Sequence, residues 1–162
     1  MNADAIVKRQ RSRGLLCKKL SDKEVLQTFA GNVAKAFAGY NITKIAAPEA
    51  MGFALASAVA VRLECGLVLM TKGRPAECET YDSISFQDDY SGVGKSLFLR
   101  IDTVNKGDSV LLVDDYVERG TQVRASCSLL SRQGTKVVGI ACLGTNTDYK
   151  HDDLPKIEVI PV

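Results

Sequence analysis

Two adjacent carboxylates, Asp114 and Asp115, follow directly on the apolar run Val110–Val113. A short continuous apolar run is typical of a buried strand, so we expect the acids at its carboxyl end. In that position they could accept hydrogen bonds from sugar hydroxyls or ligate a metal ion. A few residues further on, Gly120 and Thr121 form a small-residue turn ahead of a helical pattern.

The same segment offers a second kind of group, the successive backbone N–H donors of residues 118–122. N–H groups at a helix start bind anions, and the helix dipole adds to that attraction. An acid pair beside an anion-binding loop indicates a phosphorylated sugar as the ligand. The alternative is an acidic surface turn that only caps the following helix. The order of strand, acid pair, turn and helix favours the ligand.

Alternating elements surround this segment and must position it. We expect helices over residues 50–64 and 120–133, and another behind Ser21, whose hydroxyl fits a capping box with Glu24. Patterning predicts a β-hairpin over residues 81–87 and 95–102, and strands over residues 42–47, 67–70, 109–113, 136–143 and 157–160. Strands that alternate with helices predict an α/β fold, with a mostly parallel central sheet and helices on both faces. In such Rossmann-like sheets, ligands bind outside the carboxyl ends of the strands.

The length of 162 residues predicts a single domain over residues 1–162. We divide it into an N-terminal helical segment, residues 1–40, and an α/β core, residues 41–162. With 46% hydrophobic and 25% charged residues, the composition excludes a disordered chain. The net charge of +2 argues against a nucleic-acid partner, although six Lys and Arg residues lie in the first 20 positions. Residues 75–90 hold five acids and no Lys or Arg.

Cysteine usage and hydropathy indicate the compartment. The five cysteines include no C-x-x-C pair, and the single histidine, His151, lies in a polar loop where we expect it at the surface. We therefore expect no zinc site and a reducing environment. The N-terminus lacks the apolar core of a signal peptide, and Arg62 and Glu64 interrupt the longest apolar stretch. These features predict a cytoplasmic protein without a membrane span.

A second motif, over residues 89–96, reads Asp-Tyr-Ser-Gly-Val-Gly-Lys-Ser and differs at one position from a nucleotide-binding P-loop. A P-loop has Gly where Asp89 stands, follows a buried strand and opens a helix. The alternation after Ser96 is instead typical of a strand, so we favour a turn that leads into a strand.

The segment from Val110 to Gln122 resembles the 5-phosphoribosyl-1-pyrophosphate (PRPP) binding motif of type I phosphoribosyltransferases. In that motif an apolar strand, two acids and a small-residue loop follow one another. Residues 45–53 resemble the pyrophosphate loop of the adenine phosphoribosyltransferases, and residues 69–75 resemble the next strand end in that group. The resemblance extends from Thr43 to Thr145. By this comparison, the hairpin falls where the family has its flexible catalytic loop, and residues 1–40 form a small N-terminal hood over the base.

The resemblance implies a role for each of these positions. Asp114 and Asp115 bind the ribose hydroxyls, and Glu118 is the catalytic residue, a proton acceptor near the attacking nitrogen of the base. The 5′-phosphate is bound by Glu118, Arg119, Gly120, Thr121 and Gln122. The pyrophosphate is bound by the loop of Glu49, Ala50, Met51 and Gly52, which often contains a cis peptide bond in this family. The basic residues Lys72 and Arg74 also bind it. Mg²⁺ is held mainly through PRPP, with Asp114 and Asp115 as candidate ligands.

The implied reaction transfers the 5-phosphoribosyl group from PRPP to a nitrogenous base, with a purine of the adenine type favoured, and releases pyrophosphate. The implied partners are PRPP, a nucleobase, Mg²⁺ and a second copy of the chain in a homodimer. The alternative is a regulator of the same fold that senses PRPP or a nucleotide without turnover.

Three positions depart from the family pattern. Met51 stands where an Arg is common, and Arg119 and Gln122 stand where hydroxyl residues usually contact the 5′-phosphate. Arg119 either pairs with that phosphate or fills its pocket.

Overall fold

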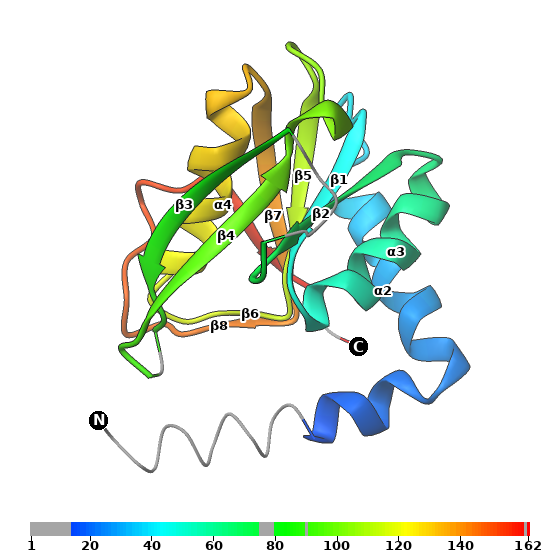
Figure 1. Ribbon diagram of the computed structural model, residues 1–162. Coiled ribbons are helices and arrows are strands. Elements are labelled where there is room, and N and C mark those ends of the chain that lie inside the picture. The colour runs from blue at the N-terminus through cyan, green and yellow to red at the C-terminus, as the bar shows by residue number, and fades with distance from the viewer. Residues whose placement is uncertain (1–13, 75–79, 90, 161) are drawn as a thin grey trace.

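A seven-stranded sheet, in the order β3-β4-β2-β1-β5-β7-β9, runs through the molecule (Figure 1). The computed structural model describes residues 14–74, 80–89, 91–160 and 162. The strands β2, β1, β5, β7 and β9 are mutually parallel, whereas β4 is antiparallel to β2 and β3 is antiparallel to β4. The strand bounds are β1 Lys44–Pro48, β2 Gly66–Thr71, β3 Tyr81–Gln87, β4 Gly94–Arg100, β5 Ser109–Val113, β7 Lys136–Cys142 and β9 Ile157–Val159. The mostly parallel sheet confirms the predicted fold class.

Helices cover both faces of the sheet (Figure 1). Helices α2 (Lys23–Ala36) and α3 (Met51–Leu63) lie on one face, and α4 (Thr121–Arg132) lies on the other. Side chains alternate along a strand, so Leu111 and Val113 of β5 pack with α2 and α3, while Leu112 packs with α4. Each face of β5 is therefore buried, which explains its unbroken apolar run.

The described part of the chain begins with a helical stretch over residues 14–20, and residues 1–13 of the predicted hood lie outside it. Helix α2 packs against α3 and buries Phe29 and Val33 completely. Its N-cap is Asp22, whose carboxylate accepts from the Glu24 N–H at 2.9 Å. The predicted capping box at Ser21 is wrong, because the Ser21 hydroxyl donates backward to the Lys18 carbonyl.

The β-hairpin forms as predicted, with pairs from Tyr81↔Arg100 to Gln87↔Gly94. A short 3₁₀ turn, η1 (Ile101–Thr103), ends β4. Since residues 94–100 form a strand of this hairpin, the segment that follows Asp89 opens no helix. The P-loop interpretation of residues 89–96 is therefore excluded.

A small second sheet was not predicted. β6 (Tyr116–Val117) pairs in parallel with β8 (Gly144–Thr145), directly beyond the ends of β5 and β7. Two-residue strands carry no periodic pattern, so nothing in the sequence distinguishes them from loop. The pair extends the carboxyl edge of the main sheet and fixes the backbone that follows Asp114 and Asp115.

Burial raises the pKa of the thiols of Cys127, to about 11, and Cys142, to about 12. These two cysteines therefore behave as small core residues. Cys78 lies outside the described residues. Among the helices that the structure describes, none is long and apolar enough to cross a membrane.

Gly139 of β7 lies directly under the Phe37 ring, and a Cβ at this position would lie 2.3 Å from Cε1 of Phe37. Phe37 is buried and contacts Tyr40 edge-on, so it has little room to move. We expect Gly139→Ala to lower the free energy of unfolding by about 1–3 kcal/mol through overpacking, measured by urea unfolding.

Gly31→Ala in α2 is the matched control, because nothing lies within 4 Å of the added methyl group. Alanine favours the helix over glycine, so this variant should gain up to about 1 kcal/mol. Equal effects of the two substitutions would contradict the packing argument.

Candidate active site

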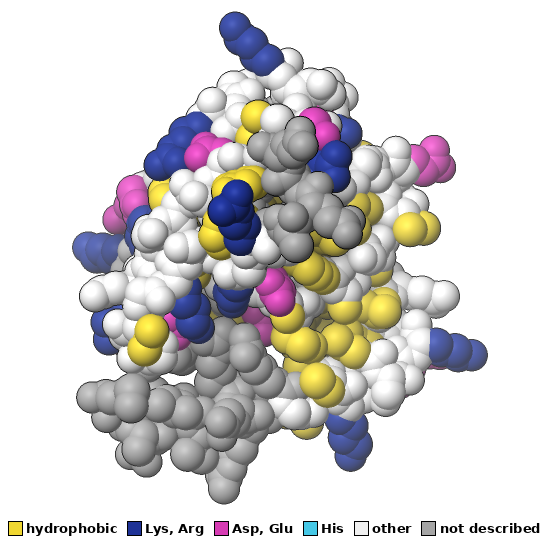
Figure 2. Space-filling model, in the orientation of Figure 1, with side chains coloured by type: hydrophobic (Ala, Val, Ile, Leu, Met, Phe, Trp, Pro, Cys, Tyr) yellow, Lys and Arg dark blue, Asp and Glu magenta, His cyan; other side chains and the backbone are white. Residues whose placement is uncertain are grey.

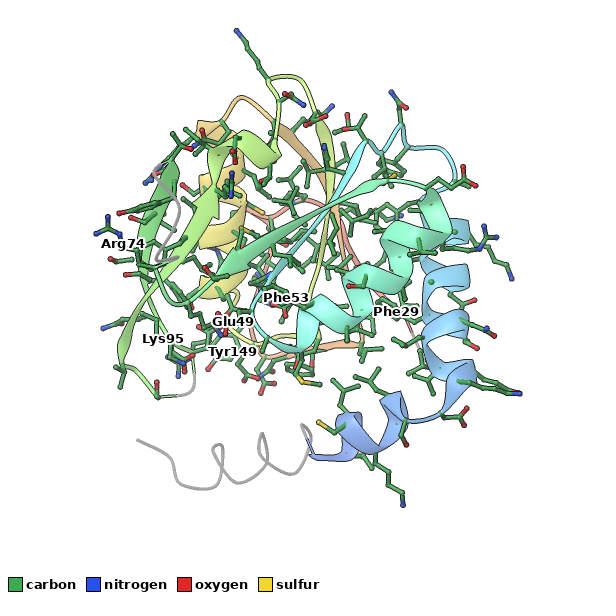
Figure 3. The ribbon with its side chains drawn as sticks, turned by 45° about the vertical axis from the view of Figure 1, so that its right-hand side comes forward. Phe29, Glu49, Phe53, Arg74, Lys95 and Tyr149 are labelled. Carbon is green, nitrogen blue, oxygen red and sulfur yellow. The ribbon has the colours of Figure 1, made fainter. Side chains whose placement is uncertain are left out.

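The carboxyl ends of β1, β2, β5 and β7 lie along one edge of the sheet, and the tip of the β3–β4 hairpin reaches the same edge (Figure 1). Figure 3 shows Glu49, Lys95 and Tyr149 at this edge, with Phe53 on the first turn of α3. In the face shown by Figure 2, carboxylate side chains lie near the centre, between hydrophobic side chains on the right and Lys and Arg side chains on the left. The edge thus brings together segments that are far apart in the sequence.

The loop after β1 is tied to the end of β2. The Glu49 N–H donates to the Met70 carbonyl at 2.9 Å, and Glu49 Oε2 accepts from the Lys72 N–H at 2.7 Å. The peptide bond between Glu49 and Ala50 is cis, as in the loop that the sequence resembles. These contacts place the predicted pyrophosphate loop beside the Lys72 backbone.

Helix α3 begins against the end of β5. A Cβ at Gly52 would lie 3.1 Å from the Val113 carbonyl oxygen and 3.4 Å from Oδ1 of Asp114, so the backbone approach requires a residue without a side chain. Ala50 and Met51, at the start of α3, complete the loop. The predicted pyrophosphate loop and the acid pair are therefore adjacent in space.

Asp114 is the most buried carboxylate of this edge, with 2% of its surface exposed. Burial, together with the charge of Asp115, raises its pKa well above the ordinary value. Its Oδ1 accepts from the Asp115 N–H at 2.9 Å, and its Oδ2 accepts from the Gln122 side-chain amide at 3.1 Å. Gln122 therefore links the start of α4 to the acid pair, a contact that spacing alone does not reveal.

Glu118 follows β6, and its Oε1 accepts from the Asn146 side-chain amide, which follows β8. The Asn146 N–H in turn donates to the Val117 carbonyl at 2.9 Å. The small sheet therefore holds both residues in register. Sequence reasoning missed Asn146, because its partner lies 28 positions away across an unpredicted strand pair.

The N–H groups at the start of α4 converge on one carboxylate oxygen, Oδ2 of Asp89 from the hairpin tip. The distances are 3.1 Å from Arg119 N, 3.1 Å from Gly120 N and 3.4 Å from Thr121 N. The Thr121 hydroxyl lies 2.6 Å from Asp89 Oδ1 and 2.7 Å from the Gln87 carbonyl oxygen. The N–H groups of residues 119–121 therefore hold a carboxylate, as donors at a helix start can.

The Arg119 side chain turns away from this loop toward Tyr149. Its guanidinium lies 5.4 Å from the Tyr149 ring centroid, and its Nε donates to the Tyr149 hydroxyl at 3.2 Å. Behind the loop, Arg124 donates to the Arg119 carbonyl at 2.6 Å and forms a two-point ion pair with Asp153. Arg119 contributes its backbone to the loop, and its side chain does not fill it.

His151 is not the surface residue that its polar neighbours predicted. Both of its ring nitrogens are buried, and Nδ1 would lie 3.2 Å from a Cβ placed on Gly120. The chain after β8 folds back behind the anion-binding loop. This return brings His151 against Gly120, whose φ of 82° favours glycine.

The two basic residues after β2 have different surroundings. Lys72 is half-buried beside Glu49, whereas the Arg74 guanidinium lies 5.0 Å from the Tyr81 ring centroid, over the hairpin (Figure 3). Three acids of residues 75–90 lie in the described part of the chain, and each has a partner. Asp82 pairs with Arg132, Asp88 pairs with Lys95, and Asp89 binds the anion-binding loop. Glu77 and Glu79 lie outside the described residues. These three carboxylates attach or stiffen the hairpin.

An acid pair with one buried member, a loop with a cis peptide bond and a helix start with converging N–H donors thus lie together at one edge of a mostly parallel sheet. The family model described as phosphoribosyl transferase domain matches residues 18–160. The chain is 36% identical to the adenine phosphoribosyltransferase of Symbiobacterium thermophilum, over 76% of this chain and 71% of that protein. It is 32% identical to that of Maridesulfovibrio salexigens, over 79% and 74% of the two chains.

A solved structure points to the same family. The crystal structure of adenine phosphoribosyltransferase from Thermoanaerobacter pseudethanolicus superposes with a TM-score of 0.77 at 30% identity, covering 88% of this chain and 84% of that one. The chain belongs to the type I phosphoribosyltransferase family, in its adenine phosphoribosyltransferase-like group. This confirms the family predicted from the acid-pair motif and favours the enzyme over the non-catalytic regulator.

The raised pKa of Asp114 predicts a pH-dependent stability. The folded state binds the Asp114 proton more tightly than the unfolded state, so the free energy of unfolding falls as pH rises above about 4. Asp114→Asn removes this titration while it keeps the size of the side chain. We expect the variant to gain stability over the wild type at pH 7, by about 1 kcal/mol or more, and less at pH 4, measured by urea unfolding.

Asp153→Asn is the control of opposite sign. Hydrogen bonding to Arg124 lowers the pKa of Asp153 to about 2, so its contribution is present above about pH 4 and is lost as pH falls through 2. That variant should lose stability at neutral pH. A pH-independent difference between the wild type and Asp114→Asn would show that Asp114 does not titrate differently on folding.

Proposed function

We propose that this chain transfers the 5-phosphoribosyl group from PRPP to adenine and releases pyrophosphate. The observation that carries the proposal is the juxtaposition of the Asp114–Asp115 pair with three N–H donors that converge on one point at the start of α4. A ribose with a 5′-phosphate needs such donors and acceptors side by side. Adenine is the base named for the relatives at 32% and 36% identity.

Each part of the substrate has its own proposed set of residues. Residues 118–122 cradle the 5′-phosphate, mainly through backbone N–H groups, because the Arg119 side chain lies on Tyr149. Asp114 and Asp115 accept hydrogen bonds from the ribose hydroxyls. The loop of Glu49, Ala50, Met51 and Gly52 binds the pyrophosphate, with Lys72 beside it. Arg74 would have to leave Tyr81 to take part.

Mg²⁺ fits this donor set as an ion held largely by substrate. Among the described residues, no three Asp, Glu, His or Cys side chains cluster as a ligand set. Mg²⁺ in such sites uses one or two carboxylates together with phosphate oxygens, and Asp114 and Asp115 could supply the carboxylates. When bound, the ion would neutralise charge on the departing pyrophosphate.

Glu118 is the proposed proton acceptor for the attacking nitrogen of the base. Displacement of pyrophosphate at C1 of the ribose passes through an oxocarbenium-like state, and a proton must leave the base nitrogen as the new bond forms. The Asn146 amide holds the Glu118 carboxylate at the edge of the site. A positioned carboxylate of this kind contributes about 10²–10⁴-fold to a rate.

The function is tested by pyrophosphate release from PRPP and Mg²⁺ with adenine, guanine, hypoxanthine, xanthine, uracil and orotate. We expect release with adenine above the other bases. Thermal stabilisation by PRPP without release from any base would support the sensor alternative. Absence of both stabilisation and release would refute the proposal.

Asp114→Asn combined with Asp115→Asn tests ribose recognition. Replacing two charged acceptors should weaken PRPP binding at least about 100-fold, because hydrogen bonds to charged groups contribute about 1.5–3 kcal/mol each. Titration calorimetry measures the affinity, and circular dichroism checks the fold. Asp108→Asn, at the opposite end of β5, removes one carboxylate charge away from the site and should leave the affinity unchanged. An unchanged affinity in the double variant would refute the assignment.

Glu118→Gln tests proton transfer apart from binding. We expect kcat to fall about 100-fold or more while the Kd of PRPP stays within about twofold, since the amide cannot take the proton. Single-turnover kinetics separate the two quantities. A variant that loses PRPP affinity and keeps kcat would place Glu118 in the phosphate site alone.

We also propose a cytoplasmic homodimer, in which residues 1–40 contribute a hood near the base. The support is the family resemblance and the place of this segment in the sequence, before β1 and α3. Sedimentation equilibrium tests the assembly directly.

A further inference from the structure

The anion-binding loop is already occupied by a group of the protein itself. Asp89 points from the hairpin tip into the N–H groups at the start of α4, with distances of 3.1, 3.1 and 3.4 Å to Oδ2. The Thr121 hydroxyl contacts the other oxygen at 2.6 Å. Under the proposed function, these donors are the ones that the 5′-phosphate of PRPP would use. A carboxylate and a phosphate cannot occupy the same donors together.

The residue before Asp89 is held by several contacts of its own. The neighbouring Asp88 carboxylate is buried and accepts from the Ser91 N–H at 2.9 Å and the Ser91 hydroxyl at 3.0 Å, and it pairs with Lys95. The Gly92 N–H donates to the Asp88 carbonyl at 2.9 Å. Asp88 thus holds the backbone directly before Asp89, and the Asp89 side chain makes the contact with the loop.

The hairpin tip is joined to the main sheet only through its own strands, whose Ile84, Phe86 and Leu97 pack in the core on the α4 side. β4 pairs with β2 only at Leu99 and Phe98, close to its far end. From Leu97 to the tip, β4 pairs with β3 alone. The contacts that hold the tip on α4 include those of Asp89 and the one between Thr121 and Gln87. Loss of these contacts would leave the tip attached through its own strands.

We infer that Asp89 is an internal ligand of the 5′-phosphate site, and that substrate must displace it. The inference rests on the proposed function for its substrate and on the hydrogen bonds of Asp89 for its mechanism. Phosphate is the stronger ligand for these donors, since it carries up to two negative charges and three acceptor oxygens against one charge and two oxygens. Binding of the 5′-phosphate releases the hairpin tip, and an empty site recaptures it.

Competition by Asp89 lowers the apparent affinity for phosphate, because phosphate binds only the fraction of molecules in which the hairpin tip is undocked. If the tip is docked in about nine molecules of ten, removal of the carboxylate raises the apparent affinity for phosphate about tenfold. Asp89 thereby sets which ligands enter, because a sugar without the phosphate cannot displace it.

Inorganic phosphate and PRPP, titrated separately by calorimetry, test the inference on Asp89→Ala and Asp89→Asn. We expect Asp89→Ala to bind inorganic phosphate about tenfold more tightly than the wild type. Asp89→Asn, which keeps an acceptor and loses the charge, should fall between the two. Asp102→Asn is the control: it makes the same change of charge as Asp89→Asn, on an exposed acid at the far end of β4. This variant should bind inorganic phosphate as the wild type does.

Thermal unfolding gives a second measurement. Without phosphate, Asp89→Ala should have a lower Tm than the wild type, because the start of α4 loses its partner. Added phosphate should close this difference, since it replaces the carboxylate. A difference that stays constant with phosphate, or an equal phosphate affinity of Asp89→Ala and the wild type, overturns the inference. Tighter binding of phosphate by Asp89→Ala, with no binding of PRPP by any variant, sustains the inference and refutes the proposed function.

Discussion

The burial of one carboxylate at the end of β5 organises this site. Asp114 is nearly inaccessible to water and depends on the Asp115 N–H and the Gln122 amide for its hydrogen bonds. Gly52 lets α3 approach to within contact of the same side chain. Two loops are thereby held against one acid. A charge in such surroundings costs stability, and the raised pKa of Asp114 expresses that cost.

Around this acid, the chain completes the site with contacts between distant segments. β6 and β8 align Glu118 with Asn146, and the return of the chain after β8 places His151 behind Gly120. Arg124 braces the loop from outside through its bond to the Arg119 carbonyl. The anion-binding loop is therefore rigid on its inner side. On its outer side the Asp89 carboxylate occupies the N–H donors, and Asp89 is the part of the site that substrate would displace.

The same acid residues have different meanings in the sequence and in the fold. As a run of negative charge, residues 75–90 look unfavourable beside pyrophosphate. In the structure, Asp82 and Asp88 pair with Arg132 and Lys95 and hold the hairpin, and Asp89 satisfies the helix start. Composition reports the sign of a charge, whereas its partners decide what the charge does.

The sequence by itself determined the α/β class, the order of the elements and the Asp114–Asp115 motif, because periodicity and local turn chemistry are written in neighbouring residues. It also predicted an anion-binding loop at residues 118–122, and the N–H groups of residues 119–121 converge on one carboxylate oxygen in the structure. Only the tertiary structure decided that Gln122 binds Asp114, that Asn146 holds Glu118 and that Asp89 enters the loop. These last two contacts join residues 28 to 32 positions apart. Their formation depends on strand register and on the reach of the hairpin, which no local pattern encodes.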